Sequence, residues 1–214
     1  MIRIAMRLLG TGAALALAAC ASAPLHYYTL VAPAAEATGG LVAPVSDTPA
    51  SPVRPSLPFE LLPVSVPAQV DQPQLVVREG GQGVALLGSE RWIAPLSDEV
   101  HGALSSNLAH ELGSQDVTGM PGNGKPALRI KLDLRRFDSQ PGSYALIEGA
   151  WSVHLLRGNH PAVLACTSRI SESVGPGYAA LVAGHQRALG ELAAQIATAA
   201  RALGNGQTPA CPAG

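Results

Sequence analysis

Residues 127–134 read Ala-Leu-Arg-Ile-Lys-Leu-Asp-Leu and alternate between apolar and polar side chains. Such an alternation places one set of side chains on each face of a β-strand, so this stretch predicts a strand with one buried and one polar face. Two similar stretches follow at 144–155 and 162–170, and short turns at 140–142 and 157–159 separate the three. Three strands joined by short turns predict an antiparallel meander whose polar face meets water or a partner.

Two amphipathic helices flank this meander. The first is predicted to begin at Ser97, which would be its N-cap, and to end at Gly113. Its apolar side chains recur every four residues: Val100, Leu104, Leu108 and Leu112. The second is predicted over 178–203 from a similar stripe: Leu181, His185, Leu189, Leu192, Ile196 and Leu203. Two helices packed on one face of an antiparallel or mixed sheet give an α+β fold.

Short strands are predicted before the first helix. Residues 26–31 are rich in aromatic and β-branched side chains, which favour extended structure. Residues 64–66 also alternate, but the flanking prolines cannot donate to a ladder, so an edge or bulged strand is expected there. Residues 74–78 and 84–87 are separated by a Gly-rich turn and predict a β-hairpin.

The N-terminus has the pattern of a bacterial secretory signal. Arg3 and Arg7 precede an apolar stretch at 8–19, which is too short to span a membrane as a mature helix. The stretch ends in Leu17-Ala-Ala-Cys20, which resembles the bacterial lipobox. This resemblance implies cleavage before Cys20, a thioether-linked lipid on that cysteine and N-acylation, and several acyl chains together anchor a protein firmly. By resemblance to the sorting of enterobacterial lipoproteins, Ala21 in place of an aspartate implies the outer membrane. The alternative is an ordinary signal peptide with an incidental cysteine.

Composition divides the chain into regions. Residues 1–19 are assigned to the signal peptide and 20–31 to the lipidated cysteine and first strand. Residues 32–57 are a Pro- and Ala-rich linker or loop, which can bury little apolar surface. Residues 58–206 form the α+β domain, and 207–214 form a tail.

Charge and cysteine content exclude several classes of protein. The net charge is −1, and only 14% of the 214 residues are charged, whereas a nucleic-acid binder normally carries a basic stripe. Three cysteines are too few for a disulfide scaffold. With Cys20 lipidated in an oxidising compartment, Cys166 and Cys211 are expected to pair. The alternative is a buried free Cys166 and an unpaired Cys211 in the tail.

Motifs that could carry chemistry are incomplete. Residues 119–126 nearly match the phosphate-binding P-loop, but Pro126 stands where that motif needs a hydroxyl for Mg²⁺. His101 and His110 do not have the i, i+4 spacing of a zinc-binding helix. No Gly-x-Ser-x-Gly elbow occurs. We therefore expect no catalytic site, no metal site and no cofactor.

Several segments of the chain share a pattern with one known family. They are the lipobox at Cys20, Tyr-Tyr-Thr-Leu at 27–30, Val-Ser-Val-Pro-Ala at 64–68, Val-Asp-Gln-Pro-Gln-Leu-Val-Val-Arg at 70–78, and Glu-Arg-Trp-Ile-Ala-Pro-Leu at 90–96. Together with the helices and the meander, they resemble the PqiC/YmbA family of ABC-type transport auxiliary lipoproteins. The linker at 32–57 is longer than that family's usual spacer.

The resemblance implies a non-enzymatic accessory subunit that is anchored in the outer membrane and faces the periplasm. The implied partners are an MCE-domain (PqiB-like) tunnel protein and its inner-membrane transporter, and the subunit is expected to form a homo-oligomer. The implied task is to dock the tunnel at the outer membrane. A carrier lipoprotein with its own apolar lipid cavity is the alternative, although the small residues of the last helix favour tight packing.

The candidate contact residues for such a partner lie around the predicted hairpin. They are Asp71, Gln72, Pro73, Arg78, Arg91 and Trp92. The alternative is that Trp92 fills the core and that Gln72 and Pro73 only form a turn, because buried and interface aromatics look alike in a sequence.

Overall fold

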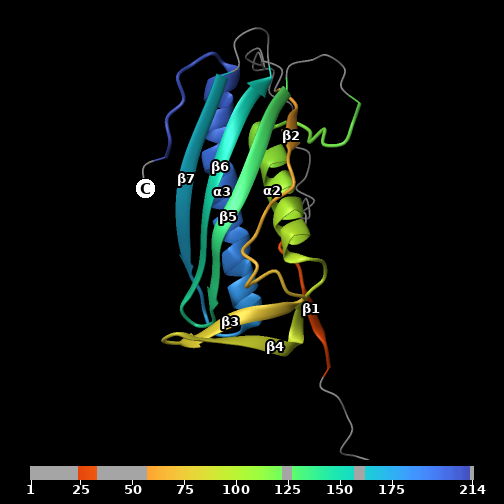
Figure 1. The fold of residues 1–214 in the computed structure, drawn as a ribbon, viewed down its shortest axis with the longest axis vertical. Coiled ribbons are helices and arrows are strands. Elements are labelled where there is room, and N and C mark those ends of the chain that lie inside the picture. The colour runs from red at the N-terminus through yellow and green to blue at the C-terminus, as the bar shows by residue number, and fades with distance from the viewer. Residues whose placement is uncertain (1–23, 33–56, 122–126, 157–161, 213–214) are drawn as a thin grey trace, which may run out of the picture.

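The computed structural model describes residues 24–32, 57–121, 127–156 and 162–212 (Figure 1). The strands in this part of the chain are β1 (His26–Tyr28), β2 (Phe59–Leu61), β3 (Gln74–Gly80), β4 (Gly83–Trp92), β5 (Ala127–Gln140), β6 (Tyr144–Leu156) and β7 (Ala162–Ser173). The helices are α2 (Leu96–Leu112) and α3 (Tyr178–Gly204). The predicted lipobox at Cys20 and nearly all of the predicted linker lie outside the described residues.

A four-stranded sheet with the order β2-β5-β6-β7 forms the larger part of the domain. The predicted meander is confirmed, because β5, β6 and β7 pair antiparallel in sequence order. β2 pairs parallel with β5 at the edge, which makes the sheet mixed. Residues 64–66 contribute only one bridge, from Ser65 to Asp133. Pro63 and Pro67 have no N–H to donate, so a regular strand cannot extend through them.

β5 continues well beyond the predicted alternation because a β-bulge changes its phase. Up to Leu134 the even-numbered side chains are buried, as predicted. The register then shifts between Leu134 and Arg136, and the odd-numbered Phe137 and Ser139 become the buried residues. Because of the bulge, β5 still directs side chains into the core after Leu134, but from odd-numbered positions.

Both helices cover the same face of the four-stranded sheet and pack against each other, which confirms the predicted α+β fold (Figure 1). Leu104 and Leu108 of α2 and Leu189 and Ile196 of α3 are among the fully buried residues of the common core. The other face of the sheet carries the exposed polar side chains.

The start of α2 differs from the prediction. The N-cap is Pro95, not Ser97, and no side chain caps this end. The Pro95 carbonyl accepts the first hydrogen bonds, from the backbone N–H groups of Asp98 and Glu99. A proline has no N–H that would be left without a partner here, so the helix can begin directly after it. The predicted end at Gly113 is confirmed, and that glycine has the left-handed conformation typical of a helix C-cap.

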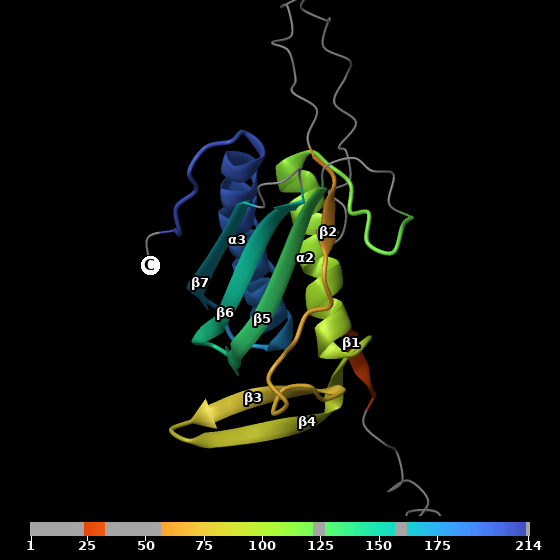
Figure 2. The ribbon, with the colours of Figure 1, turned by 45° about the horizontal axis from the view of Figure 1, so that its top comes forward.

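A second, three-stranded sheet with the order β1-β4-β3 lies at one end of the domain (Figure 2). The predicted hairpin is confirmed, since β3 and β4 pair antiparallel, and β4 extends to Trp92. β1 pairs in parallel with the last residues of β4. We call this unit the small sheet. It gives the domain two mixed sheets in place of the single sheet that the sequence predicts.

Candidate anchoring and docking site

The N-terminal strand is attached to the small sheet by a buried carboxylate. Glu90 of β4 accepts hydrogen bonds from His26 Nδ1 at 2.9 Å and from the Tyr28 hydroxyl at 2.6 Å. The bond from Tyr28, followed by the bond from His26, lowers the pKa of Glu90. Burial, together with the neighbouring Glu90 carboxylate, raises the pKa of Tyr28 to about 12. Glu90 therefore stays ionised and holds both side chains of β1 at neutral pH.

A second buried carboxylate fixes the residues that follow β1. Glu99 of α2 accepts hydrogen bonds from the Thr29 hydroxyl and from the Leu30 backbone N–H, each at 2.8 Å. Gln186 of α3 donates to the Thr29 carbonyl at 3.1 Å, and the Leu30 side chain is buried in the core. Residues 26–30 are thus held by β4, α2 and α3, and a force applied to the N-terminal chain is transmitted to the whole domain.

Most of the predicted contact residues surround the small sheet. Asp71, Gln72 and Pro73 form a turn before β3, and the Pro73 carbonyl accepts the backbone N–H of Trp92 at 2.9 Å. Arg91 lies opposite Gln74 in the next strand, which places it beside this turn. The structure therefore brings these residues together at one edge of the small sheet.

Arg78 and Trp92 are placed differently from the other candidates. Arg78, near the hairpin tip, forms an ion pair with Asp138 of β5 at 3.2 Å. Trp92 is only 5% exposed, and its ring meets Phe137 edge-on with the centroids 6.1 Å apart. Trp92 is therefore a core residue, and its prediction as a surface contact is wrong. Burial of the large Trp92 indole stabilises the junction between the two sheets more than an exposed Trp92 would.

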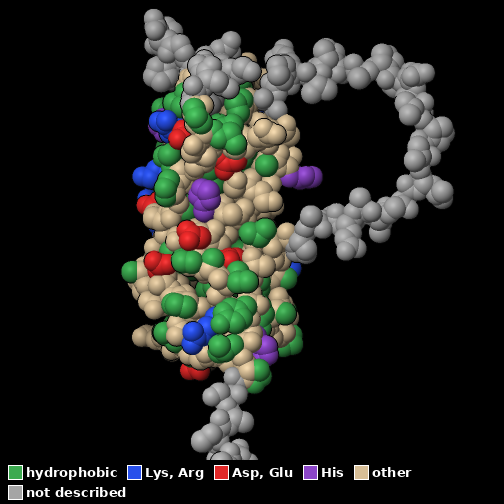
Figure 3. Space-filling model, turned by 90° about the vertical axis from the view of Figure 1, so that its right-hand side faces the viewer, with side chains coloured by type: hydrophobic (Ala, Val, Ile, Leu, Met, Phe, Trp, Pro, Cys, Tyr) green, Lys and Arg blue, Asp and Glu red, His purple; other side chains and the backbone are tan. Residues whose placement is uncertain are grey.

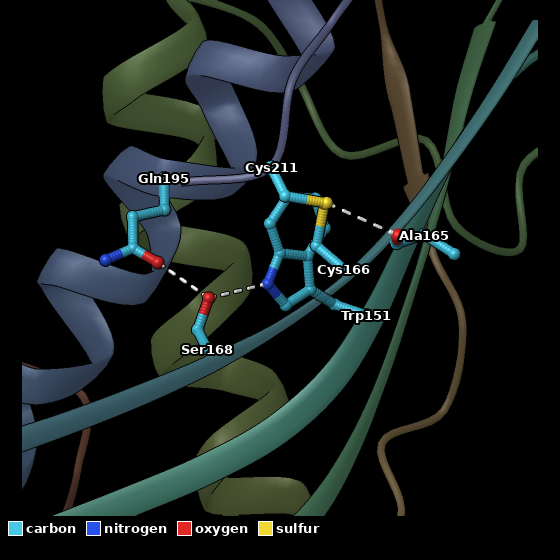
Figure 4. Close-up of a disulfide and its surroundings, with 6 residues drawn as sticks. All are labelled: Trp151, Ala165, Cys166, Ser168, Gln195 and Cys211. Atoms are coloured by element: carbon cyan, nitrogen blue, oxygen red, sulfur yellow. Dashed lines mark hydrogen bonds between the residues drawn. A yellow bond between two sulfur atoms is a disulfide. The ribbon is translucent and has the colours of Figure 1, made fainter. Parts of the chain in front are cut away.

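A disulfide between Cys166 of β7 and Cys211 ties the C-terminal tail to the large sheet (Figure 4). The two Cα atoms are 5.5 Å apart, and Cys211 Sγ lies 3.4 Å from the Ala165 carbonyl oxygen. Beside the disulfide, Trp151 Nε1 donates to Ser168, and the Ser168 hydroxyl donates to Gln195 of α3 (Figure 4). The disulfide and this polar chain join β7, the tail and α3.

Replacing Cys211 with serine is expected to lower the free energy of unfolding by about 2–4 kcal/mol. The disulfide spans a sequence separation of 45 residues, and its loss frees that loop in the unfolded chain. Urea denaturation with and without a reductant measures the effect. The reduced wild-type protein should unfold at the same urea concentration as Cys211→Ser, and an unchanged midpoint after reduction would argue against the disulfide.

His185 belongs to the predicted apolar stripe of α3 and is fully buried. It is 0% exposed, its ring stacks on Phe137 with the centroids 3.9 Å apart, and its Nε2 lies 2.8 Å from the Ser139 hydroxyl. Burial lowers the pKa of His185 to about 3. Its position in the apolar stripe between Leu181 and Leu189 is the sequence signal for burial. It contributes to packing at the junction of the two sheets, where Trp92 also contacts Phe137.

The described residues contain no group of three or more His, Cys, Asp or Glu side chains that could hold a metal ion. His101 Nε2 lies 3.3 Å from the Leu61 carbonyl oxygen, and His110 is exposed. The P-loop-like stretch lies mainly outside the described residues. Within the described part of the chain, no helix is both long enough and apolar enough to cross a membrane.

The fold and this end of the domain define a small α+β module with a firmly attached N-terminal strand. The family model for the ABC-type transport auxiliary lipoprotein component matches residues 40–197, and the chain belongs to this family. It is therefore a lipoprotein-type accessory component associated with a transporter system and with the cell envelope.

One solved structure shares the fold of this chain. The crystal structure of an uncharacterized protein superposes with a TM-score of 0.59 at 16% identity and covers 82% of this chain and 97% of that chain. A Xanthomonas campestris protein of the family DUF330 gives a TM-score of 0.48 at 18% identity and covers 69% of this chain and 86% of that chain. No match was found among curated proteins.

Proposed function

We propose that this chain is an outer-membrane lipoprotein that docks an MCE-type tunnel protein of a lipid transport system, without catalysing a reaction itself. The observation that carries the proposal is the attachment of β1. Cys20, the proposed lipid site, stands six residues before His26, and Glu90 and Glu99 bind β1 and the residues after it. A lipid on Cys20 would therefore hold the whole folded domain at a membrane.

The exposed turn before β3 is the part of the small sheet that we assign to the partner. Asp71 and Pro73 are exposed and Gln72 is half-buried, so their side chains are available for contact. Arg78 and Arg91 are half-buried at the two ends of the hairpin. Asp71, Gln72, Pro73 and Arg78 lie on the β3 side of the small sheet and include both charges, which suits a polar, specific contact with another protein.

Crosslinking in intact cells followed by purification of this chain tests the proposed partner. Recovery of an MCE-domain protein is the expected result, and Asp71→Arg should reduce the yield of that crosslink because it reverses the charge of the exposed turn. Cells that make the protein at normal levels but give no crosslink to an MCE-domain protein would contradict the docking role.

A lipid carrier is the second candidate function, and the packing of the helices disfavours it. A Cβ added at Gly184 of α3 would lie 2.3 Å from Val174 and 3.0 Å from Ala145, and one at Gly149 of β6 would lie 3.0 Å from Leu132. The Gly184 contacts show that α3 lies directly against β6 and the residue after β7, and the Gly149 contact shows that β5 and β6 pack tightly within the sheet. A hollow of about 510 Å³ lies on the outer face of the sheet, beside Lys131 and Ala150, and not under α3.

Extraction of lipids from purified protein distinguishes the two candidates. Extraction leaves covalently attached acyl chains on the protein and releases only bound lipid. A docking subunit in its unacylated form, Cys20→Ala, should therefore release no phospholipid. Stoichiometric phospholipid in Cys20→Ala would favour the carrier.

A further inference from the structure

Three large apolar side chains are exposed around β1: Leu25 at 50%, Tyr27 at 57% and Ile93 at 67%. They share one surface. Tyr27 lies opposite Arg91 in the parallel pair of β1 and β4, and the Ile93 backbone N–H donates to the Tyr28 carbonyl at 2.9 Å. Side chains two residues apart on a strand point the same way, so Leu25 lies beside Tyr27 and Ile93 lies beside Arg91. We call these four residues the β1 patch.

Figure 3 shows hydrophobic side chains at the end of the domain that carries β1, with basic and acidic side chains beside them. Single exposed apolar residues are common on soluble proteins, so the patch alone identifies no partner. The position of the patch in the sequence, close to Cys20, indicates what it contacts. Five peptide steps separate Cys20 from Leu25, and even a fully extended chain spans at most about 18 Å over that length.

The β1 patch is also rigid with respect to the domain. Tyr27 stands between His26 and Tyr28, whose side chains bind Glu90 on the opposite, inner side of the strand. The patch therefore cannot turn away from the N-terminal chain without breaking these bonds. Whatever surface holds Cys20 must meet the patch or come close to it.

The charges around the patch suit a lipid surface. Residues 24–31 and 91–94 contain Arg91 and His26 but no aspartate or glutamate. The neighbouring Glu90 is turned inward and buried, and the exposed Asp71 lies on the β3 side of Arg91, away from β1. Tyrosine is enriched at membrane interfaces, where its ring is apolar and its hydroxyl is hydrated. Apolar side chains next to an arginine match the acyl and phosphate layers of a bilayer surface.

We infer that the β1 patch rests on the membrane that holds the acyl chains of Cys20, with Leu25, Tyr27 and Ile93 at the level of the headgroups and Arg91 beside lipid phosphates. The inference rests on the proposed function, because it takes Cys20 to be acylated. It also fixes the orientation of the domain. The β1 edge of the small sheet faces the lipid, and the β3 edge, on the other side of β4, stays open to the protein partner. The far end, where β6 ends and β7 begins, points away from the lipid (Figure 1).

Photo-crosslinking to lipid tests this contact. The photoreactive amino acid p-benzoylphenylalanine replaces Tyr27 in one variant, Ile93 in a second and Val163 in a third, which is the matched control. Val163 is 56% exposed, like Tyr27, but lies at the far end on β7. Each acylated protein is reconstituted in vesicles of phosphatidylethanolamine and phosphatidylglycerol, irradiated, and analysed by mass spectrometry for adducts of phospholipid mass.

The inference predicts phospholipid adducts at positions 27 and 93 in at least tenfold greater yield than at 163. Equal yields at all three positions would overturn it, as would crosslinks at 27 and 93 that join two copies of the chain and contain no lipid. In both cases the protein would still be bound to the vesicles, so the proposed anchoring would stand. A chain that carries no acyl group and does not remain with the vesicles would overturn the anchoring and this inference together.

Discussion

Replacing Gly184 with alanine is expected to lower the free energy of unfolding by up to about 2 kcal/mol. Alanine is intrinsically better than glycine in a helix by about 1 kcal/mol, so the loss must come from packing. The added Cβ would lie 2.3 Å from Val174 Cγ1 and 3.0 Å from Ala145 Cβ. Neither neighbour can move freely, because both are buried in the cluster that joins the small sheet to α3. Overpacking of such a site typically costs about 1–3 kcal/mol, and here it also has to cancel the helix propensity.

Gly190 provides the matched control in the same helix. A Cβ at Gly190 would meet no atom within 4 Å, so Gly190→Ala should gain about 0.5–1 kcal/mol from helix propensity. Urea denaturation of the two variants should therefore shift the midpoint in opposite directions. A stabilised Gly184→Ala protein would show that α3 does not lie as close to the sheet as described.

Acidification should destabilise the protein through His185 by about 1.4 kcal/mol per pH unit below pH 6.5. The folded protein holds this side chain neutral because burial lowers its pKa to about 3, while an unfolded chain binds a proton near the ordinary pKa of about 6.5. Between these values only the unfolded state takes up the proton. The contribution to stability is therefore complete above pH 6.5 and is lost as the pH falls toward 3.

Comparison with His185→Gln isolates this contribution from those of the carboxylates. Glutamine can still bond the Ser139 hydroxyl but does not titrate. Between pH 6.5 and 4.5, the wild-type protein should lose about 2.7 kcal/mol more stability than His185→Gln. Replacement of the exposed His110 by glutamine should leave the wild-type pH dependence unchanged. Parallel stability curves for the wild type and His185→Gln would mean that His185 is not buried in a neutral form.

The elements that could be predicted from the sequence are those whose signal is local. The strict alternation at 127–134 identifies the core strand of the large sheet, and the apolar stripe at 178–203 identifies α3. The bulge in β5 has no such signal, because a change of phase looks like the end of a strand. Residues 135–140 were therefore missed although they belong to β5.

The contacts at the anchoring end depend on partners far apart in the sequence. Glu90 is held by His26 and Tyr28, and Glu99 by residues 29 and 30. The sequence presents Glu99 only as an acidic residue in the first turn of a helix, although it is buried. Trp92 illustrates the same limit, because the size of an aromatic side chain favours burial in a core and in an interface equally. Only the fold shows that Phe137 covers it.

We expect a lipid on Cys20 to hold this domain at the outer membrane, and fractionation of cells that produce Cys20→Ala tests this claim. The wild-type protein should be found with the outer membrane. Cys20→Ala should be found in the soluble periplasmic fraction with the same melting temperature, because Cys20 precedes β1 (His26–Tyr28) in the sequence. Cys211→Ser, which also removes one cysteine, should stay with the membrane. A Cys20→Ala protein that still fractionates with the outer membrane would contradict the claim.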